Sequence, residues 1–221
     1  MMEKSSHDLD LLNWLIDSRP LAVSSFGGSL LFRPNPNLPD LCPDCLHKDC
    51  PYYAKPQFSE AAGDEILYDF LSDDNHRCIY NIDKDVTDNQ SVCIQYANGA
   101  IVNFMLSFNC SGERSGRNFH AVGSKGRIWG NIEANDLKMY QNQTGKVTNY
   151  DLGTVSAGHN GGDENHALEL LKMMKDSEYR PAQGSYAGYL STALCIAADT
   201  AMTEGRLIKF RYDANAYISF A

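Results

Sequence analysis

Apolar residues near the start of the chain recur at intervals of three and four, which is the spacing of an amphipathic helix. The residues that carry this pattern are Leu11, Trp14 and Leu15. Ser5 or Ser6 can cap such a helix and Pro20 would end it. The pattern therefore predicts a helix over residues 3–17.

The middle of the chain is rich in strand-forming residues that are interrupted by turn residues. Three hairpins are predicted, over 91–96 and 100–108, over 119–122 and 127–132, and over 137–141 and 146–152. The pair Asn98-Gly99 suits a type I′ turn in the first of them. Further strands are predicted over 21–32 and 207–210, and helices over 163–175 and 185–203. In the first of these helices Ala167, Leu168, Leu171 and Met174 are expected to face inward, and the apolar positions of the second are Leu190, Leu194, Ala197, Ala198 and Ala201.

Consecutive hairpins without helices between them indicate an antiparallel sheet. We therefore predict an α+β fold, with one large, mostly antiparallel open sheet and helices packed on one face. Residues 1–221 are predicted to form a single domain. A proline-rich and cysteine-rich insertion over 33–80 lacks periodicity, and an insertion of that length needs its own source of stability.

Composition and charge narrow the class of protein. The 221 residues include 19 basic and 28 acidic side chains, a net charge of −9, and no basic stripe. Nucleic acid is therefore an unlikely partner. Because we see neither a secretion signal nor an apolar run that could cross a membrane, we expect a cytoplasmic protein without membrane contact.

Seven cysteines are an odd number, and without secretion a disulfide framework is disfavoured. Cys42, Cys45 and Cys50 form a Cys-x2-Cys-x4-Cys run inside the insertion. This spacing is typical of thiolate ligands, and Cys78 is the best fourth donor, with His47 and His76 in reserve. A structural zinc site is favoured over an iron-sulfur cluster or free thiols. The remaining three, Cys93, Cys110 and Cys195, fall in strand or helix patterns and are expected to pack as small hydrophobic residues.

A polar stripe lies on the predicted first helix. Glu3, His7 and Asp10 fall at i, i+4 and i+7, and Lys4 is adjacent. An imidazole beside a carboxylate suits general acid/base catalysis, since the carboxylate fixes the tautomer of the ring. The alternative is a solvated first helical turn, in which acidic residues favour the helix dipole.

A second polar segment, 158–164, directly precedes the predicted helix 163–175. Gly161 and Gly162 would let backbone N–H groups approach a ligand closely. His159 and Asp163 could then bracket a polyhydroxylated substrate. Alternatively, Asp163 is only a helix cap and the glycines only a turn.

Together these segments resemble the C-terminal half of the Gfo/Idh/MocA oxidoreductases, the family of glucose-fructose oxidoreductase and inositol dehydrogenase. The resemblance covers nearly the whole chain. It rests on the sequence over 3–12, Val-Ser-Ser-Phe-Gly over 23–27, the cysteine run, Arg-Cys-Ile-Tyr over 77–80, Val-Gly-Ser-Lys-Gly over 122–126 and Gly-His-Asn-Gly-Gly-Asp over 158–163.

The resemblance implies an NAD(P)-dependent oxidoreductase of sugars or cyclitols that forms oligomers through its open sheet. His7 is similar to the catalytic histidine of an Asp-x3-His pattern, although Glu3 replaces the aspartate. Asp10 resembles the acidic residue that orients the imidazole, and His159 and Asp163 resemble a polar loop at the substrate pocket.

The chain lacks Gly-x-Gly-x-x-Gly and the Glu-Lys-Pro segment that would carry the family's catalytic lysine. We therefore expect the substrate-side half of an enzyme whose Rossmann domain, with its NAD or NADP site, is elsewhere, in the same or in a separate polypeptide. The alternative is a catalytically silent module that binds carbohydrate or forms homo-oligomers.

Overall fold

The computed structural model describes residues 1–53, 76–110, 116–132, 134, 136–151, 153, 161–181 and 184–221. These residues form two compact units. The first comprises Met1–Asn109 and Ala187–Ala221, and the second is Cys110–Tyr186. Both contain antiparallel sheets, and the described part of the chain also contains helices, so the predicted α+β class is confirmed. The strands are divided between two sheets, whereas one large sheet was expected.

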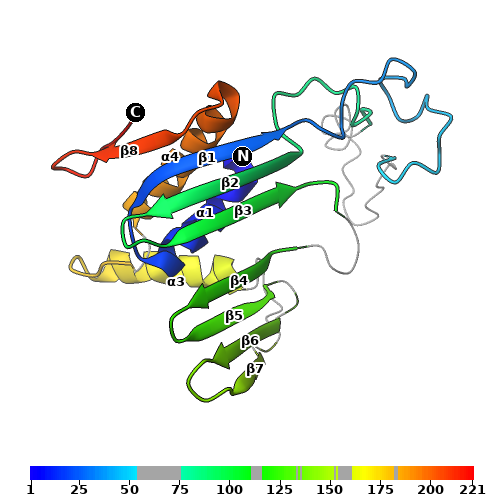
Figure 1. Cartoon of the computed structure of the whole chain (residues 1–221). Helices are drawn as coiled ribbons and strands as arrows, with labels where there is room; N and C mark the ends of the chain where they lie inside the picture. The colour runs from blue at the N-terminus through cyan, green and yellow to red at the C-terminus, as the bar shows by residue number, and fades with distance from the viewer. Residues whose placement is uncertain are drawn as a thin grey trace. The chain divides into compact units, whose positions relative to one another are not determined.

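The first unit is built on a five-stranded sheet with the strand order β3-β2-β1-β8-β9. Its strands are β1 (Pro20–Gly28), β2 (Asn89–Tyr96), β3 (Ile101–Ser107), β8 (Ile208–Tyr212) and β9 (Ile218–Phe220). All neighbouring strands are antiparallel. Helices α1 (Met2–Ile16) and α4 (Ser185–Glu204) cover one face of this sheet (Figure 1). In the described part of this unit, the other face carries exposed side chains such as Phe26 and Met105.

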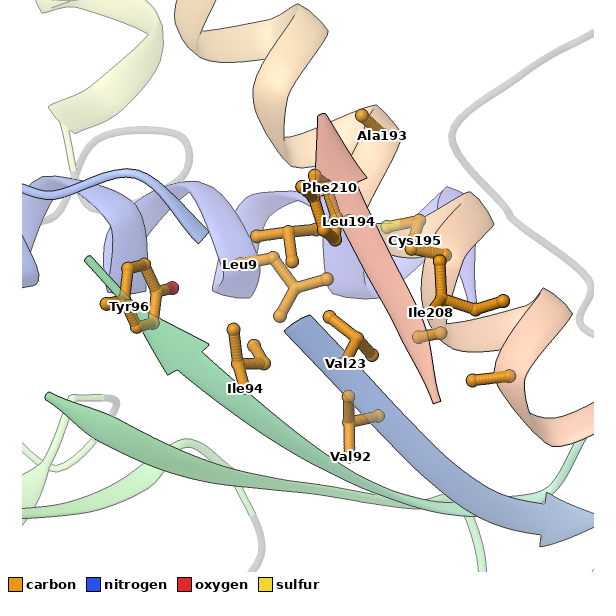
Figure 2. Packing of buried hydrophobic residues seen from close by; sticks show 13 residues of the cluster. Leu9, Val23, Val92, Ile94, Tyr96, Ala193, Leu194, Cys195, Ile208 and Phe210 are labelled. Atoms are coloured by element: carbon orange, nitrogen blue, oxygen red, sulfur yellow. The ribbon is translucent and has the colours of Figure 1, made fainter. Parts of the chain in front are cut away.

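The core of this unit lies between the sheet and its two helices. Strand alternation directs Val23, Ile94 and Ile208 toward the helices, where each is fully buried against Leu9 of α1 and Leu194 of α4 (Figure 2). The apolar positions that the sequence pattern gave for α4 are also buried, namely Leu190, Leu194, Ala197, Ala198 and Ala201. Small alanines on α4 let the helix approach the sheet closely.

The β2–β3 hairpin has the predicted position but a different turn. Gly99 has φ 88°, whereas Asn98 is not among the residues with positive φ. A type I′ turn needs positive φ at both central residues, so the prediction of that turn was wrong. The Gly99 N–H donates to the Tyr96 carbonyl at 3.0 Å, and a single left-handed glycine completes the reversal.

The second unit contains a four-stranded meander. Its strands are β4 (Asn118–Gly123), β5 (Gly126–Asn131), β6 (Asp136–Gln141) and β7 (Val147–Asp151), paired in chain order. This arrangement confirms the second and third predicted hairpins. Gly130 is required in β5, because a Cβ there would come within 1.9 Å of the Asp136 carbonyl oxygen.

Helix α3 (Gly162–Lys175) forms where it was predicted, but its apolar side is not buried. Leu168, Leu171 and Met174 are 47%, 48% and 76% exposed, although they were expected to face inward. The periodicity shows which residues share a helix face and leaves open what covers that face. No helix in the described part of the chain is long and apolar enough to span a membrane.

Helix α1 also begins differently from the prediction. It starts at Met2, so Ser5 and Ser6 lie inside the helix and cap nothing. It ends before Pro20, at Asp17, which adopts the left-handed conformation with φ 48°. Trp14, which contributed to the predicted apolar stripe, is 60% exposed.

Asp88, the residue directly before β2, holds the chain segment that follows β1 and leads into the insertion. Its buried carboxylate accepts hydrogen bonds from the backbone N–H groups of Leu30, Leu31 and Phe32, at 2.8, 2.9 and 2.8 Å. Burial by itself would raise the pKa of Asp88. The backbone donors and the amide of Asn89 outweigh burial and lower that pKa to about 2. Asp88 is therefore an anionic anchor for the chain after β1.

Candidate functional site

The predicted catalytic residues lie on α1. The side of this helix that packs in the core carries Ser5, Leu9 and Asn13, which are all buried. His7 lies about 160° around the helix axis from both Ser5 and Leu9, and its side chain is exposed. The fold therefore presents His7 on the side of α1 that points away from the sheet.

Lys4 and Asp10 flank His7 on the same side of the helix, one turn before and one turn after it. Lys4 is exposed and Asp10 is half-buried. Glu3 belongs to the helix, but its side chain lies outside what the structure describes. A ligand above this side of α1 would meet an imidazole with a carboxylate and an ammonium group beside it.

Contacts on the buried side hold α1 in place. The Tyr96 hydroxyl of β2 donates to Asn13 Oδ1 at 3.0 Å, and burial raises the pKa of Tyr96. The hydroxyl therefore keeps its proton as a donor at neutral pH. This contact and the packing of Leu9 fix the rotation of α1, and with it the direction in which His7 points.

The second predicted polar segment is described only in part. His159 lies outside the described residues. Gly161 is the N-cap of α3 with φ 83°, a left-handed conformation that favours glycine. Asp163 lies in the first turn of α3 instead of capping the helix, after Gly162. A substrate-binding role for these residues stays a prediction.

The fold brings together the two ends of the predicted metal-binding segment. Leu41 and Arg77 form an isolated antiparallel bridge. On either side of it, the Cys42 N–H donates to the His76 carbonyl and the Cys78 N–H donates to the Asp40 carbonyl, both at 2.7 Å. Cys42 and Cys78 thus lie on neighbouring segments, although 36 positions separate them in sequence.

The rest of the cysteine run follows in tight turns. The Cys45 N–H donates to the Cys42 carbonyl at 3.0 Å, as expected of a Cys-x2-Cys turn. Burial, together with the nearby Cys50, Tyr52 and Cys78, raises the pKa of Tyr80. Cys42, Cys45 and Cys78 are buried and Cys50 is half-buried.

An aromatic cluster supplies part of the stability that the insertion was expected to need. Phe32 is 4% exposed and makes edge-on ring contacts with Tyr52 at 4.8 Å and Tyr80 at 5.8 Å. The Asn81 amide also donates to the Leu38 carbonyl at 2.7 Å. These ring contacts and this hydrogen bond stabilise the described parts of the insertion.

Within the described residues, no group of three or more His, Cys, Asp or Glu side chains is arranged to hold a metal ion. Zinc at Cys42, Cys45, Cys50 and Cys78 stays a prediction. Of the cysteines expected to serve packing, Cys195 is buried, and burial raises its pKa to about 11. Cys93 and Cys110 are exposed, so that expectation was wrong for both.

If the cysteine run binds zinc, the purified chain will contain close to one zinc per molecule. Cys45→Ser will then release most of the metal, because a Cys-x2-Cys turn supplies two of the four ligands. Cys93→Ser, which removes an exposed thiol of β2, is the matched control and should leave the zinc content unchanged. The zinc content of the native chain and of both variants is measured by mass spectrometry. Native protein without zinc, in which all four thiols react freely, would refute the site.

The part of the chain that contains α1 matches a known protein family. Residues 1–129 match the family described as the GFO/IDH/MocA C-terminal domain, and this match covers more than half of the 221 residues. The chain belongs to the GFO/IDH/MocA C-terminal domain family. The resemblance inferred from the sequence motifs is thereby confirmed. The match to this family includes His7 and the first three strands of the large sheet.

One curated relative extends the similarity over most of the chain. It is YteT of Bacillus subtilis (strain 168), provisionally named an oxidoreductase, with 29% identity over 226 aligned residues. The alignment covers 87% of this chain and 51% of YteT. This GFO/IDH/MocA C-terminal domain chain therefore spans about half the length of that relative.

Solved structures of low sequence identity share the fold. Levoglucosan dehydrogenase, solved with NADH and levoglucosan, has a TM-score of 0.63 at 13% identity, with 94% of this chain and 49% of that chain covered. An oxidoreductase domain protein from Kribbella flavida has a TM-score of 0.62 at 16% identity, covering 93% and 49%. Aldose-aldose oxidoreductase from Caulobacter crescentus, complexed with glycerol, has a TM-score of 0.57 at 13% identity, covering 93% and 45%.

Proposed function

We propose that this chain forms the substrate-side half of an NAD(P)-dependent oxidoreductase of sugars or cyclitols, with His7 as its acid/base. The observation that supports this most is the exposure of His7 beside Asp10, on the side of α1 opposite the packed stripe. The segment that carries them lies within the family match. Two of the solved relatives are named for oxidoreductases that act on carbohydrates.

In this proposal the chain supplies the proton chemistry. A bound nicotinamide would accept a hydride from the carbon that bears the reacting hydroxyl. The His7 imidazole takes the proton from that hydroxyl, so that a C=O bond can form as the hydride leaves, and it returns the proton in the reverse direction. Asp10 orients the imidazole. The ammonium group of Lys4 stabilises the negative charge that develops on the reacting oxygen.

Nicotinamide binding is assigned to a domain outside these 221 residues, because the sequence contains no Gly-x-Gly-x-x-Gly. The experiment therefore joins this chain to the half of YteT that lies outside the match. Sugar-dependent or cyclitol-dependent reduction of NAD⁺ or NADP⁺ by the joined protein is expected. If no sugar or cyclitol is oxidised by a folded joined protein that binds the nucleotide, the proposal fails.

A second role, homo-oligomer formation, is supported by the open face of the five-stranded sheet. Phe26 of β1 and Met105 of β3 both pair with Ser91 of β2, so they share that face. They are 77% and 76% exposed, and Ile101 at the end of β3 is 67% exposed. Such an apolar surface needs cover in water, and a second copy with the same surface can supply it.

Replacing two of these residues tests the oligomer. Phe26→Glu combined with Met105→Glu should shift the chain from dimer or higher oligomer to monomer, because four carboxylates would meet across a symmetric interface. Leu46→Glu, at a side chain that is 92% exposed in the insertion, is the matched control. Sedimentation equilibrium provides the measurement. A wild-type chain that is already monomeric would contradict this role.

A further inference from the structure

The meander of the second unit presents a shallow groove of about 490 Å³ on one of its faces. Strand pairing places His120 of β4 opposite Trp129 of β5, and Asn118 opposite Asn131. Alternate residues of a strand share a face. The residues that line the groove include Asn118, His120, Arg127, Trp129, Asn131 and Asp136.

Trp129 is one of the residues that line this groove. Its indole is half-buried, so part of the ring is open to a ligand. The His120 ring meets it edge-on, with centroids 6.4 Å apart at 84°, and the Arg127 guanidinium lies 5.3 Å from its centroid. Because Trp129 lies on a strand that is paired on both sides, its position is well defined. A flat, partly open indole is a surface on which the C–H groups of a sugar ring can pack.

Polar groups at one end of the groove are held in place. Asn131 donates to Asn118 Oδ1 at 2.9 Å and accepts a hydrogen bond from the Ala134 N–H at 2.8 Å. Asp136 is paired with Lys138 at 3.0 Å. Amide and carboxylate groups that are fixed beside an aromatic ring can bond the hydroxyl groups of a ligand that stacks on the ring.

The positive charge of Arg127 favours a ligand with a negatively charged group. Its guanidinium lies over the rings of Trp129 and Tyr140, at 5.3 and 5.1 Å. Among the described residues, the ion pairs that the structure records join other side chains, and none involves Arg127. A guanidinium that lies over two rings can still offer N–H groups to a carboxylate of a ligand. The chain as a whole carries a net charge of −9 and repels polyanions. The single Arg127 cation therefore suits a ligand that places one anionic group beside it.

We propose that this groove binds an acidic sugar, with one sugar ring packed on the part of the Trp129 indole that Arg127 leaves uncovered and a carboxylate of the ligand paired with Arg127. The groove shares no residue with α1, so the proposal does not depend on hydride transfer or on His7. A nucleic acid is a poorer occupant, because one guanidinium cannot offset the repulsion between a polyanion and an acidic chain.

The chain has two tryptophans, which makes the test direct. In Trp14→Phe, Trp129 is the single source of tryptophan fluorescence. Trigalacturonate should change that fluorescence in a saturable manner. Galactotriose, its neutral counterpart, should bind at least tenfold more weakly, since it lacks the carboxylates that pair with Arg127.

Calorimetry on variants of the full chain then locates the site. Arg127→Met and Trp129→Ala should each weaken trigalacturonate binding at least tenfold, which is the usual effect of removing an anchor at the centre of an interface. Arg206→Met, which removes an exposed arginine of the first unit, is the matched control and should bind trigalacturonate normally. Arg127 is exposed, so its variant keeps the test informative if Trp129→Ala does not fold.

Three results would overturn the proposal. One is the absence of saturable binding, and another is binding that Arg127→Met leaves unchanged. The third is equal affinity for the neutral trisaccharide. Because no nicotinamide is present, none of these results bears on the proposed oxidoreductase.

Discussion

Replacing His7 with alanine in the joined protein is expected to lower kcat by about 100-fold or more, within the range attributed to general acid/base catalysis. The physical reason is that the reacting hydroxyl would lose the group that takes its proton. KM for the sugar should change much less, because His7 acts on the proton and Lys4 and Asp10 remain. Steady-state rates of sugar-dependent nicotinamide reduction provide the measurement.

Two comparisons separate catalysis from helix damage. Leu15→Ala removes a side chain of α1 that is 46% exposed and should leave kcat within about twofold, as surface substitutions usually do. The pH profile of His7→Gln should lose the limb that depends on the imidazole, whereas structural damage would lower the rate at every pH alike. Unchanged turnover in His7→Ala would remove His7 from the mechanism.

Replacing Asp88 with alanine should reduce the free energy of unfolding by about 3 kcal/mol at neutral pH. The change leaves the N–H groups of Leu30, Leu31 and Phe32 without their acceptor, and Phe32 lies in the aromatic cluster. Urea denaturation provides the measurement. Asp85→Asn, three residues away at an exposed site, is the matched control and should change stability by less than about 0.5 kcal/mol.

The stabilisation from Asp88 should depend on pH in a defined direction. Its pKa falls from 3.8 in the unfolded chain to about 2 in the folded protein, so folding favours the carboxylate. The contribution, about 2 kcal/mol, is complete above about pH 4 and is lost as the pH falls toward 2. The difference in stability between wild type and Asp88→Asn should therefore shrink over that interval. A difference that stays constant would refute the assignment.

Local sequence patterns predicted most of the elements correctly, because turn residues and alternation act over short distances. The hairpins over 91–108 and 119–132 and helix α4 follow directly from them. Helix faces were harder to predict. Ser5 and Asn13 lie in the core while Trp14 is exposed, since burial depends on the sheet beneath α1 and on the Tyr96 hydroxyl that bonds Asn13.

In the candidate sites too, local sequence patterns predicted turns and strand faces but not contacts between distant segments. Spacing identified Cys42 and Cys45 as a turn, but a bridge between distant segments determines how close Cys78 comes to them. Asp88 was missed, because three backbone donors on a remote loop have no signature in sequence. Trp129 and Arg127 were missed as well, although their i and i+2 spacing in a predicted strand already placed them on one face.

The most direct test of the central proposal compares three proteins: this chain, the half of YteT outside the match, and the two joined together. Each is supplied with NAD⁺ or NADP⁺ and a panel of sugars and cyclitols, and formation of reduced nicotinamide is followed. Our account predicts substrate-dependent reduction by the joined protein and none by either half alone. Equal reduction by the YteT half without this chain would contradict the substrate-side role.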